Sequence, residues 1–356
     1  MTLQARVPGK AVLIGEYAVT DGLPAMVMAL DRHAVVSIEG CGSDDCHVLA
    51  PQLSTQAYRF RIDQSNSLQW QRDHHDWAAF DWTARLIERL LELHGAVGAG
   101  AGGLSPFRLE IDTAALYFQL DRQRIKLGLG SSSAITVGLD RVLEAFLDPT
   151  ECTPEQRLLR LLPVYRAAQG NQGSGIDLAC SIQGGVVEFQ RRSGAIRSEP
   201  IALPRALQWL FAWTGVPAST PELLSKYQDW QARKPVAAGE WRQRAKTLVD
   251  NYRQACLDED ASRVLGALRA YGHEMRTIGR FMGVDLTAGA HDAIMQQADV
   301  LGLAAKPSGA GVGDLSIIAG TDPEAMQAMR AWLVSRNVPE VAMNIELEGA
   351  SLLRLD

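Results

Sequence analysis

Residues 126–134 read Lys-Leu-Gly-Leu-Gly-Ser-Ser-Ser-Ala, and no other stretch says as much about how this chain folds. Gly128 and Gly130 allow the backbone to turn tightly and to approach a ligand without interference from a Cβ atom. Beyond the serines, apolar residues recur at spacings of three and four, which predicts a helix that ends before Asp148-Pro149. A Gly/Ser loop at a helix N-terminus presents free N–H groups and a positive dipole, so it indicates an anion site; a connector that only caps the helix is the alternative.

Two further glycine-containing segments have the composition of ligand-binding loops. The first, residues 7–19, places Lys10 after a Pro-Gly turn at the start of a buried strand, where its charge can neutralise a phosphate or polarise a hydroxyl. A surface lysine whose stem lies on apolar residues would give the same pattern. The second, residues 306–314, has alternating glycines before a strand, which permits a nest of N–H groups around an anion; a tight turn into an edge strand is the alternative.

An aspartate ends another glycine-rich turn, residues 169–177, which closes with Gly-Ser-Gly-Ile-Asp. Asp177 in this place can orient or deprotonate a substrate hydroxyl. It can equally cap the short helix expected at residues 177–181. The chain has no Walker A sequence, so a P-loop NTPase is disfavoured, and it has no H-x-E, HExxH or G-x-S-x-G sequence.

Length and composition set further bounds. The 356 residues exceed the usual size of one domain, so two domains are expected, residues 1–195 and 196–356, with the crossing near residues 191–204. The net charge of −6 argues against nucleic acid or an anionic membrane as the main partner. No stretch approaches the roughly 20 apolar residues of a membrane span, and the N-terminus lacks an apolar signal-peptide core. Five scattered cysteines fit reduced thiols in a cytoplasmic protein better than a zinc site.

Helix and strand patterns are intermixed along the chain. Helices are expected at residues 76–94, 154–168, 239–257, 260–281, 287–301 and 323–336, and strands at 3–7, 11–14, 107–111, 186–190, 207–213, 315–319, 341–348 and 351–355. Hairpin-like pairs of strands among these helices predict an α+β fold and not a doubly wound sheet.

Residues 8–19, 126–134 and 306–314 together resemble, in order and separation, the three motifs of the GHMP kinase superfamily. Its members include galactokinase, homoserine kinase, mevalonate kinase and phosphomevalonate kinase, and the resemblance covers nearly the whole chain. It implies a two-domain α+β fold, with an N-terminal domain like ribosomal protein S5 domain 2 and a ferredoxin-like C-terminal domain. It also implies that ATP and Mg²⁺ bind in the cleft between the domains.

Three details within the superfamily are similar to the phosphomevalonate kinases. They are Glu-Tyr-Ala-Val at residues 16–19, Gly-Ser-Gly-Ile-Asp at 173–177 and Trp-Thr-Gly-Val-Pro-Ala-Ser-Thr at 213–220. A strand end with hydroxyl caps is the alternative for the third.

Four features of the sequence depart from the family pattern. Ser133 replaces an alanine of the second motif, and Val312 replaces a glycine of the third. Residues 171–172 make the approach to Asp177 one residue longer. Residues 165–166 are Tyr-Arg where mevalonate kinases carry a magnesium-binding glutamate, so the metal ligands beyond Ser132 are left open.

The resemblance implies ATP-dependent phosphorylation of the phosphate of 5-phosphomevalonate. Because that phosphate is already an anion, positioning and charge neutralisation dominate, and no strong base is required. Lys10 would bridge the acceptor and the transferred group, Asp177 would orient Lys10 and the substrate, and Ser132 would bind magnesium. The triphosphate site would comprise Lys126, Gly128, Leu129, Gly130, Ser131, Ser132 and Ser133. The acceptor side and phosphate cleft would comprise Glu16, Tyr17, Ser174, Gly175, Ser219, Thr220, Ser308, Gly309, Ala310 and Gly311.

Other functions stay open. A mevalonate kinase, or another small-molecule kinase of this superfamily, would require Asp177 to act on a neutral hydroxyl. A non-catalytic binding protein with the same fold is motivated by Ser133 and Val312, which alter the shape of their loops, and a decarboxylase of the superfamily is a minor alternative. None of these patterns indicates the oligomeric state.

Overall fold

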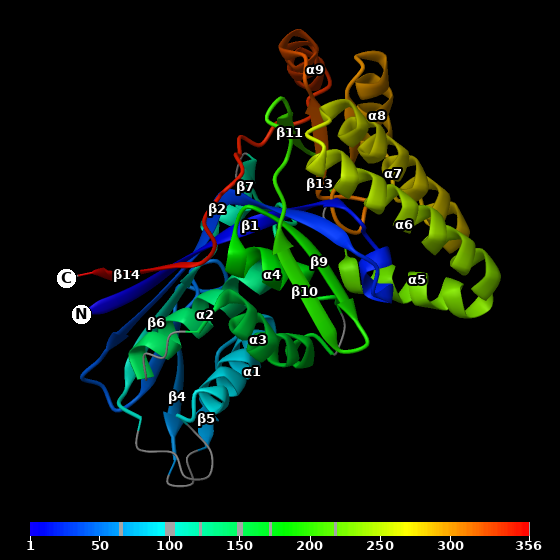
Figure 1. Ribbon diagram of the computed structural model, residues 1–356. Coiled ribbons are helices and arrows are strands. Elements are labelled where there is room, and N and C mark those ends of the chain that lie inside the picture. Colours follow the sequence, from blue (N-terminus) through cyan, green and yellow to red (C-terminus); the bar gives the residue numbers. More distant parts are fainter. Residues whose placement is uncertain are drawn as a thin grey trace.

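The computed structural model describes residues 1–63, 67–96, 104–120, 123–147, 152–170, 173–216 and 219–355. The chain forms a larger unit around a nine-stranded sheet and a smaller unit around a three-stranded sheet (Figure 1). Strands and helices are mixed in both units, which confirms the predicted α+β class. Among the described helices, none is both long enough and apolar enough to cross a bilayer.

The larger sheet is built on two long antiparallel neighbours, β1 (Thr2–Ile14) and β2 (Ala25–Gly40). The second half of β1 is buried throughout, as its apolar run predicts. The other strands of this sheet are β3 (Cys46–Leu49), β4 (Tyr58–Ile62), β5 (Leu68–Trp70), β6 (Phe107–Asp112), β9 (Val186–Arg192), β10 (Ala195–Pro200) and β14 (Ser351–Leu355). The order runs β10-β9-β2-β6-β3-β4-β5, and β1 pairs with both β2 and β14. The two chain ends therefore lie side by side (Figure 1).

Four helices belong to the larger unit: α1 (Trp77–Leu93), α2 (Ser131–Leu147), α3 (Pro154–Ala168) and α4 (Ile176–Gln183). The helix predicted after the Gly/Ser loop is confirmed as α2, which packs its buried apolar residues against β1 and β2. Its expected stop at Asp148-Pro149 lies outside the described residues, as do residues 171 and 172.

A buried charge network fixes α3 on α2. Arg157 pairs with Asp140, and its Nη2 lies 2.6 Å from Oε2 of Glu144. Arg160 pairs with both carboxylates at 3.0 and 2.9 Å, and His94 Nε2 lies 3.1 Å from Asp140. Because loss of one partner would leave an uncompensated buried charge, the network holds the two helices in one relative position. The N-terminus of α2 and the C-terminus of α3 both reach the cavity described below.

The smaller unit has antiparallel strands in the order β11 (Gln208–Trp213), β13 (Leu315–Gly320), β12 (Ala304–Pro307). Its helices are α5 (Thr220–Arg233), α6 (Pro235–Leu257), α7 (Ala261–Met282), α8 (Ala290–Val300) and α9 (Pro323–Ser335).

Between β6 and α2, a hairpin of β7 (Tyr117–Leu120) and β8 (Gln123–Lys126) leads into the glycine loop. Short 3₁₀ helices are found at Ala18–Asp21 and Ala114–Leu116.

Most predicted elements are present, but two expectations are wrong. The Pro-Gly turn predicted before Lys10 does not form, because strands 3–7 and 11–14 are one strand, β1, with a register shift between Pro8 and Gly9. The second error is the strand predicted at residues 341–348. Residues 341–348 form no continuous ladder, because the chain crosses here from the smaller unit back to the larger sheet. Among the described residues, Ile345 forms an isolated bridge with Leu30, and Glu340, just before this stretch, forms another with Ala212. After the predicted boundary at 195/196, β10 still pairs with β9, and β14 returns to β1. Helix α5 and the β7–β8 hairpin were not expected from the sequence.

Candidate active site

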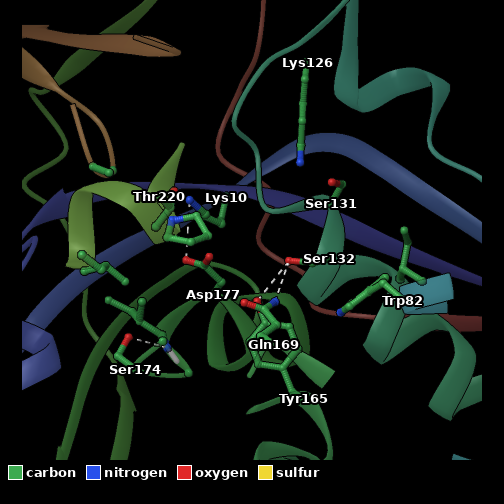
Figure 2. A pocket seen from close by; sticks show the side chains of 18 of the residues that line it. Lys10, Trp82, Lys126, Ser131, Ser132, Tyr165, Gln169, Ser174, Asp177 and Thr220 are labelled. Atoms are coloured by element: carbon green, nitrogen blue, oxygen red, sulfur yellow. Dashed lines mark hydrogen bonds and ion pairs between the residues drawn. The ribbon is translucent and has the colours of Figure 1, made fainter. Parts of the chain in front are cut away.

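Twelve of the nineteen predicted site residues line a cavity of about 550 Å³ where the two units meet. The other seven, among them Gly128, Leu129 and Gly130 of the glycine loop, are not among the described lining residues. Its wall is formed by parts of β1, α1, α2, α3 and α4 in the larger unit, and by the start of α5 and the loop after β12 in the smaller one. Figure 2 shows this cavity: Lys10 and Asp177 lie close together, and Trp82 lies on the opposite side of the view. The fold thus brings together segments that are far apart in the sequence.

Lys10 and Asp177 form an ion pair in the cavity wall. The N–H of Lys10 donates to the carbonyl of Leu129 at 3.0 Å, which ties β1 to the glycine loop. Its Nζ lies 3.5 Å from Oδ1 of Asp177 and 3.4 Å from the carbonyl oxygen of Gly128. Asp177 is in the first turn of α4, where the helix dipole favours a carboxylate. The side chains are 9% and 29% exposed, so the ammonium is held in place yet can be reached by a ligand.

The loop before α2 needs glycine at two positions. Gly128 and Gly130 have φ of +73° and +76°, which L side chains rarely adopt. A Cβ on Gly130 would lie 3.0 Å from Cε of Lys10, and one on Gly128 would lie 2.5 Å from the carboxyl group of Asp314. Leu129 between them is buried in the core. The loop therefore presses its backbone against the lysine that the sequence places in the site.

The three serines after the loop face different directions, because successive residues of a helix are about 100° apart. Ser131 and Ser132 line the cavity. Ser133 points into the interior, where its hydroxyl donates to the carbonyl of Gly130 at 2.7 Å and lies 3.1 Å from Oγ of Ser181. The serine that departs from the family pattern therefore supports the loop from behind.

Ser132 is held by two residues that the sequence analysis did not assign to the site. Its Oγ lies 3.1 Å from the hydroxyl of Tyr165 and accepts a hydrogen bond from Nε2 of Gln169 at 3.1 Å (Figure 2). Burial raises the pKa of Tyr165, with a further contribution from Asp177, so the phenol keeps its proton. The four-residue spacing of Tyr165 and Gln169 puts both on one side of the α3 terminus, and this spacing was the available signal.

The loop after β12 reaches the cavity through two of its four predicted residues. Gly309 and Ala310 line the wall beside Glu16 and Tyr17, and the Tyr17 hydroxyl donates to the carbonyl of Ala310. The N–H of Gly309 donates to Oε1 of Glu16 at 3.4 Å. These contacts place the end of β1 against the smaller unit.

Ser308 and Gly311 are used for support. The Ser308 hydroxyl donates to the carbonyl of Val12 at 3.2 Å. Gly311 has φ of +82°, and a Cβ there would lie 2.7 Å from the carbonyl oxygen of Leu286. Neither residue is part of the cavity wall that the described residues define.

The remaining predicted residues are divided between the wall and the surface. Ser174, Gly175 and Thr220 line the cavity, and Lys126 reaches it from the side of Ser131 (Figure 2). Ser219 is exposed at the N-cap of α5 and is not among the described lining residues. Residues 217 and 218 of the same stretch lie outside the described residues.

An apolar part of the wall was not predicted. It contains Ala50, Leu53, Ala79, Trp82, Ile111 and Ile135. These residues come from α1, α2, β6 and the segment after β3, so no local pattern in the sequence marks them as neighbours. This part of the cavity offers a surface for a flat, weakly polar group.

A buried histidine supports the loop after β12 from the other side. His291 of α8 has Nδ1 2.5 Å from Oγ of Ser316 and Nε2 3.0 Å from the carbonyl oxygen of Gly313. Burial lowers the pKa of His291 to about 4, and the charge of Lys306 adds to this effect. The imidazole is therefore neutral in the folded protein.

This histidine predicts acid sensitivity. The unfolded chain binds a proton at His291 below about pH 6.5, whereas the folded chain does so only near pH 4. The stabilisation is therefore complete above pH 6.5 and is lost as the pH falls to 4, by about 3 kcal/mol. Urea unfolding of the wild type and of His291→Asn across this range measures it. The free energy of unfolding of the variant should change less with pH, and parallel curves would contradict the assignment.

The sequence of the chain is similar to those of two curated kinases. No protein-family model matches the chain. The chain is 29% identical to the phosphomevalonate kinase of a Streptomyces species, over 99% of this chain and 96% of that protein. It is 25% identical to the mevalonate kinase of Thermococcus sibiricus, over 88% and 87% of the two chains.

Solved structures share the fold. The Lin0012 protein from Listeria innocua matches with a TM-score of 0.84 and 20% identity over 99% of both chains. A Streptococcus pneumoniae phosphomevalonate kinase, in complex with phosphomevalonate and AMPPNP, matches with a TM-score of 0.74 and 17% identity over 97% and 99%. These likenesses confirm the resemblance drawn from the three motifs: the chain has the two-domain fold of the GHMP kinases, with phosphomevalonate kinase and mevalonate kinase among its similar relatives.

Proposed function

We propose that the chain is an ATP-dependent kinase that converts 5-phosphomevalonate to 5-diphosphomevalonate. The observation that carries this proposal is the Lys10–Asp177 pair, with 3.5 Å between Nζ and Oδ1, in the wall of a cavity beside a glycine loop and a helix N-terminus. The 29% identity to a phosphomevalonate kinase supports this acceptor.

The site's task is to bring two anions together. In the transfer, an oxygen of the acceptor phosphate bonds to the γ-phosphorus while the bond to the β-phosphate oxygen of ADP breaks. Lys10 screens the repulsion between the groups, and Asp177 holds Lys10 in position. The backbone of the loop around Gly128 and Gly130 and the start of α2 provide N–H groups for the triphosphate. The apolar part of the wall is available to the base of the nucleotide.

Mg²⁺ is expected to accompany ATP, and the donor present fits it. Magnesium prefers oxygen ligands and shares them with phosphates and water. The hydroxyl of Ser132 is an oxygen donor in the wall and would hold the ion together with the nucleotide phosphates and water. When bound, it would neutralise charge on the nucleotide phosphates. Tyr165 and Gln169 orient Ser132 for this purpose.

The proposal includes a cytoplasmic location, with ATP and phosphomevalonate as the partners. Neither nucleic acid nor a membrane is among them, in keeping with the net charge of −6. Mevalonate kinase is the second candidate, because the chain is also 25% identical to an enzyme of that name. In that case the partly exposed Asp177 would accept the proton of the acceptor hydroxyl.

The direct test of the proposed function is which acceptor the protein phosphorylates. With phosphomevalonate, kcat/KM for ADP release is expected to exceed that with mevalonate by at least about tenfold, because an absent phosphate leaves buried polar groups unpaired. A coupled ADP assay with phosphomevalonate, mevalonate, homoserine and galactose measures this ratio. Comparable turnover of mevalonate would move the assignment to the second candidate.

A further inference from the structure

A second lysine near the cavity, Lys306 in β12, is completely buried. Its Nζ pairs with Oε1 of Glu16, donates to the carbonyl of Pro307 at 2.6 Å and lies 3.5 Å from the carbonyl oxygen of Val12. An ammonium group has three N–H donors, so these three acceptors account for all of them. Lys306 is therefore fully engaged by protein groups and is not free to bind a ligand.

Its partner Glu16 is 3% exposed and is shared between two groups of the smaller unit. Oε1 receives both Lys306 and the N–H of Gly309. Oε2 is enclosed and has no hydrogen-bond partner among the residues that the structure describes. Burial raises the pKa of Glu16 and lowers that of Lys306, while each charge opposes the effect on the other. Burying such a pair costs desolvation free energy that its mutual attraction does not fully offset, so stability alone does not explain why it is there.

The pair joins the two units at the cavity. Glu16 lies two residues after the end of β1, which carries Lys10. Lys306 is the second-last residue of β12, just before the loop whose Gly309 and Ala310 form part of the cavity wall. The Tyr271 hydroxyl of α7 donates to the carbonyl of Glu16 at 2.7 Å, which adds a second link from the smaller unit to the same residue. The position of the loop relative to Lys10 thus depends on this junction.

We propose that Lys306 is a positioning residue: through Glu16 it fixes the Gly309–Ala310 wall against the end of β1, and so sets the width of the cavity that Lys10 and Asp177 also line. Lys306 touches neither substrate, and its effect is transmitted by Glu16 and the N–H of Gly309. The consequence for catalysis rests on the proposed kinase function, whereas the consequence for the loop does not.

The experiment uses three variants of the full chain. Lys306→Met removes the ammonium and leaves Glu16 as an unpaired buried carboxylate. Glu16→Met combined with Lys306→Met replaces the pair by apolar side chains of similar volume, which often restores stability. Glu16→Gln keeps the shape of the site and an acceptor for Lys306 while removing only the negative charge of the pair. Arg269→Met is the matched control, since Arg269 donates to the carbonyl of Leu303 at 2.8 Å, just before β12, far from Glu16 in the chain.

Two readouts separate positioning from stability. In Lys306→Met the Tm should fall by about 5 °C or more, whereas the double variant should return to within about 3 °C of the wild type. In both, the amide of Gly309 should exchange with solvent at least about tenfold faster, and kcat/KM for the acceptor should fall at least about tenfold. Glu16→Gln should change the exchange rate at Gly309 and kcat/KM in the same directions, but by smaller factors. Arg269→Met should change neither of these two quantities.

The proposal would be overturned if the double variant regained wild-type kcat/KM and slow exchange at Gly309 along with its Tm. The pair would then serve stability alone. Wild-type exchange and kinetics in Glu16→Gln and Lys306→Met would do the same. Hydrogen exchange needs no substrate, so faster exchange in an enzyme that phosphorylates none of the tested acceptors would support the positioning role and reject the proposed function.

Discussion

Replacement of Lys10 by methionine is expected to lower kcat by about three orders of magnitude or more, while the Kd for ATP stays within about threefold. Methionine retains the stem that packs against the glycine loop but removes the charge 3.5 Å from Asp177. That charge matters most as the phosphoryl group moves between two anions, so its loss is felt in the transition state. Steady-state kinetics with phosphomevalonate and calorimetry with ATP measure the two quantities.

Asp177→Asn distinguishes between the two candidate acceptors. If the acceptor is a phosphate, no base is needed, and this variant should lose less kcat than Lys10→Met. If the acceptor is a hydroxyl, the loss should be at least as large. Lys246→Met is the control, since Lys246 is a surface residue that pairs with Asp250 one helical turn away. Wild-type rates in both site variants would show that the chemistry takes place elsewhere.

The glycine loop and its helix could be predicted because their signal is local. Glycines at 128 and 130 followed by a three-and-four apolar spacing indicate both the turn and α2, and the structure has both. The pairing of Lys10 with Asp177 is different, since the two residues are 167 positions apart and no pattern joins them. It was expected only because the order of motifs resembles a known superfamily.

The parts that could not be predicted depend on where side chains point after folding. Three consecutive serines look alike in the sequence, yet Ser133 faces the interior while Ser131 and Ser132 face the cavity. Residues 341–348 have strand composition, but they cross between units and find no continuous partner. Likewise Lys306 reads as the first residue of a glycine motif, and only its burial against Glu16 reveals that it holds two units together.

Replacement of Gly130 by valine is expected to raise the Kd for ATP by about a hundredfold or more in a protein that still folds. The backbone φ here is +76°, so any side chain adds strain, of about 1–3 kcal/mol. The new Cβ would also lie 3.0 Å from Cε of Lys10 and 3.1 Å from Oγ of Ser133, and the branched methyl groups must displace one of them. The valine side chain would therefore occupy the place where the loop backbone has to approach the triphosphate. Calorimetry with ATP, together with circular dichroism for the fold, measures the effect.

Gly283→Val separates strain from contact. Gly283 ends α7 with a similar φ of +69°, but a Cβ there would meet no atom of the described chain within 4 Å. Both variants should therefore lose a similar amount of stability from backbone strain, while only Gly130→Val should lose ATP affinity. Equal affinities in the two folded variants would mean that the loop is a connector, because a backbone that cradles phosphate cannot accept a branched side chain beside Lys10 without releasing the nucleotide.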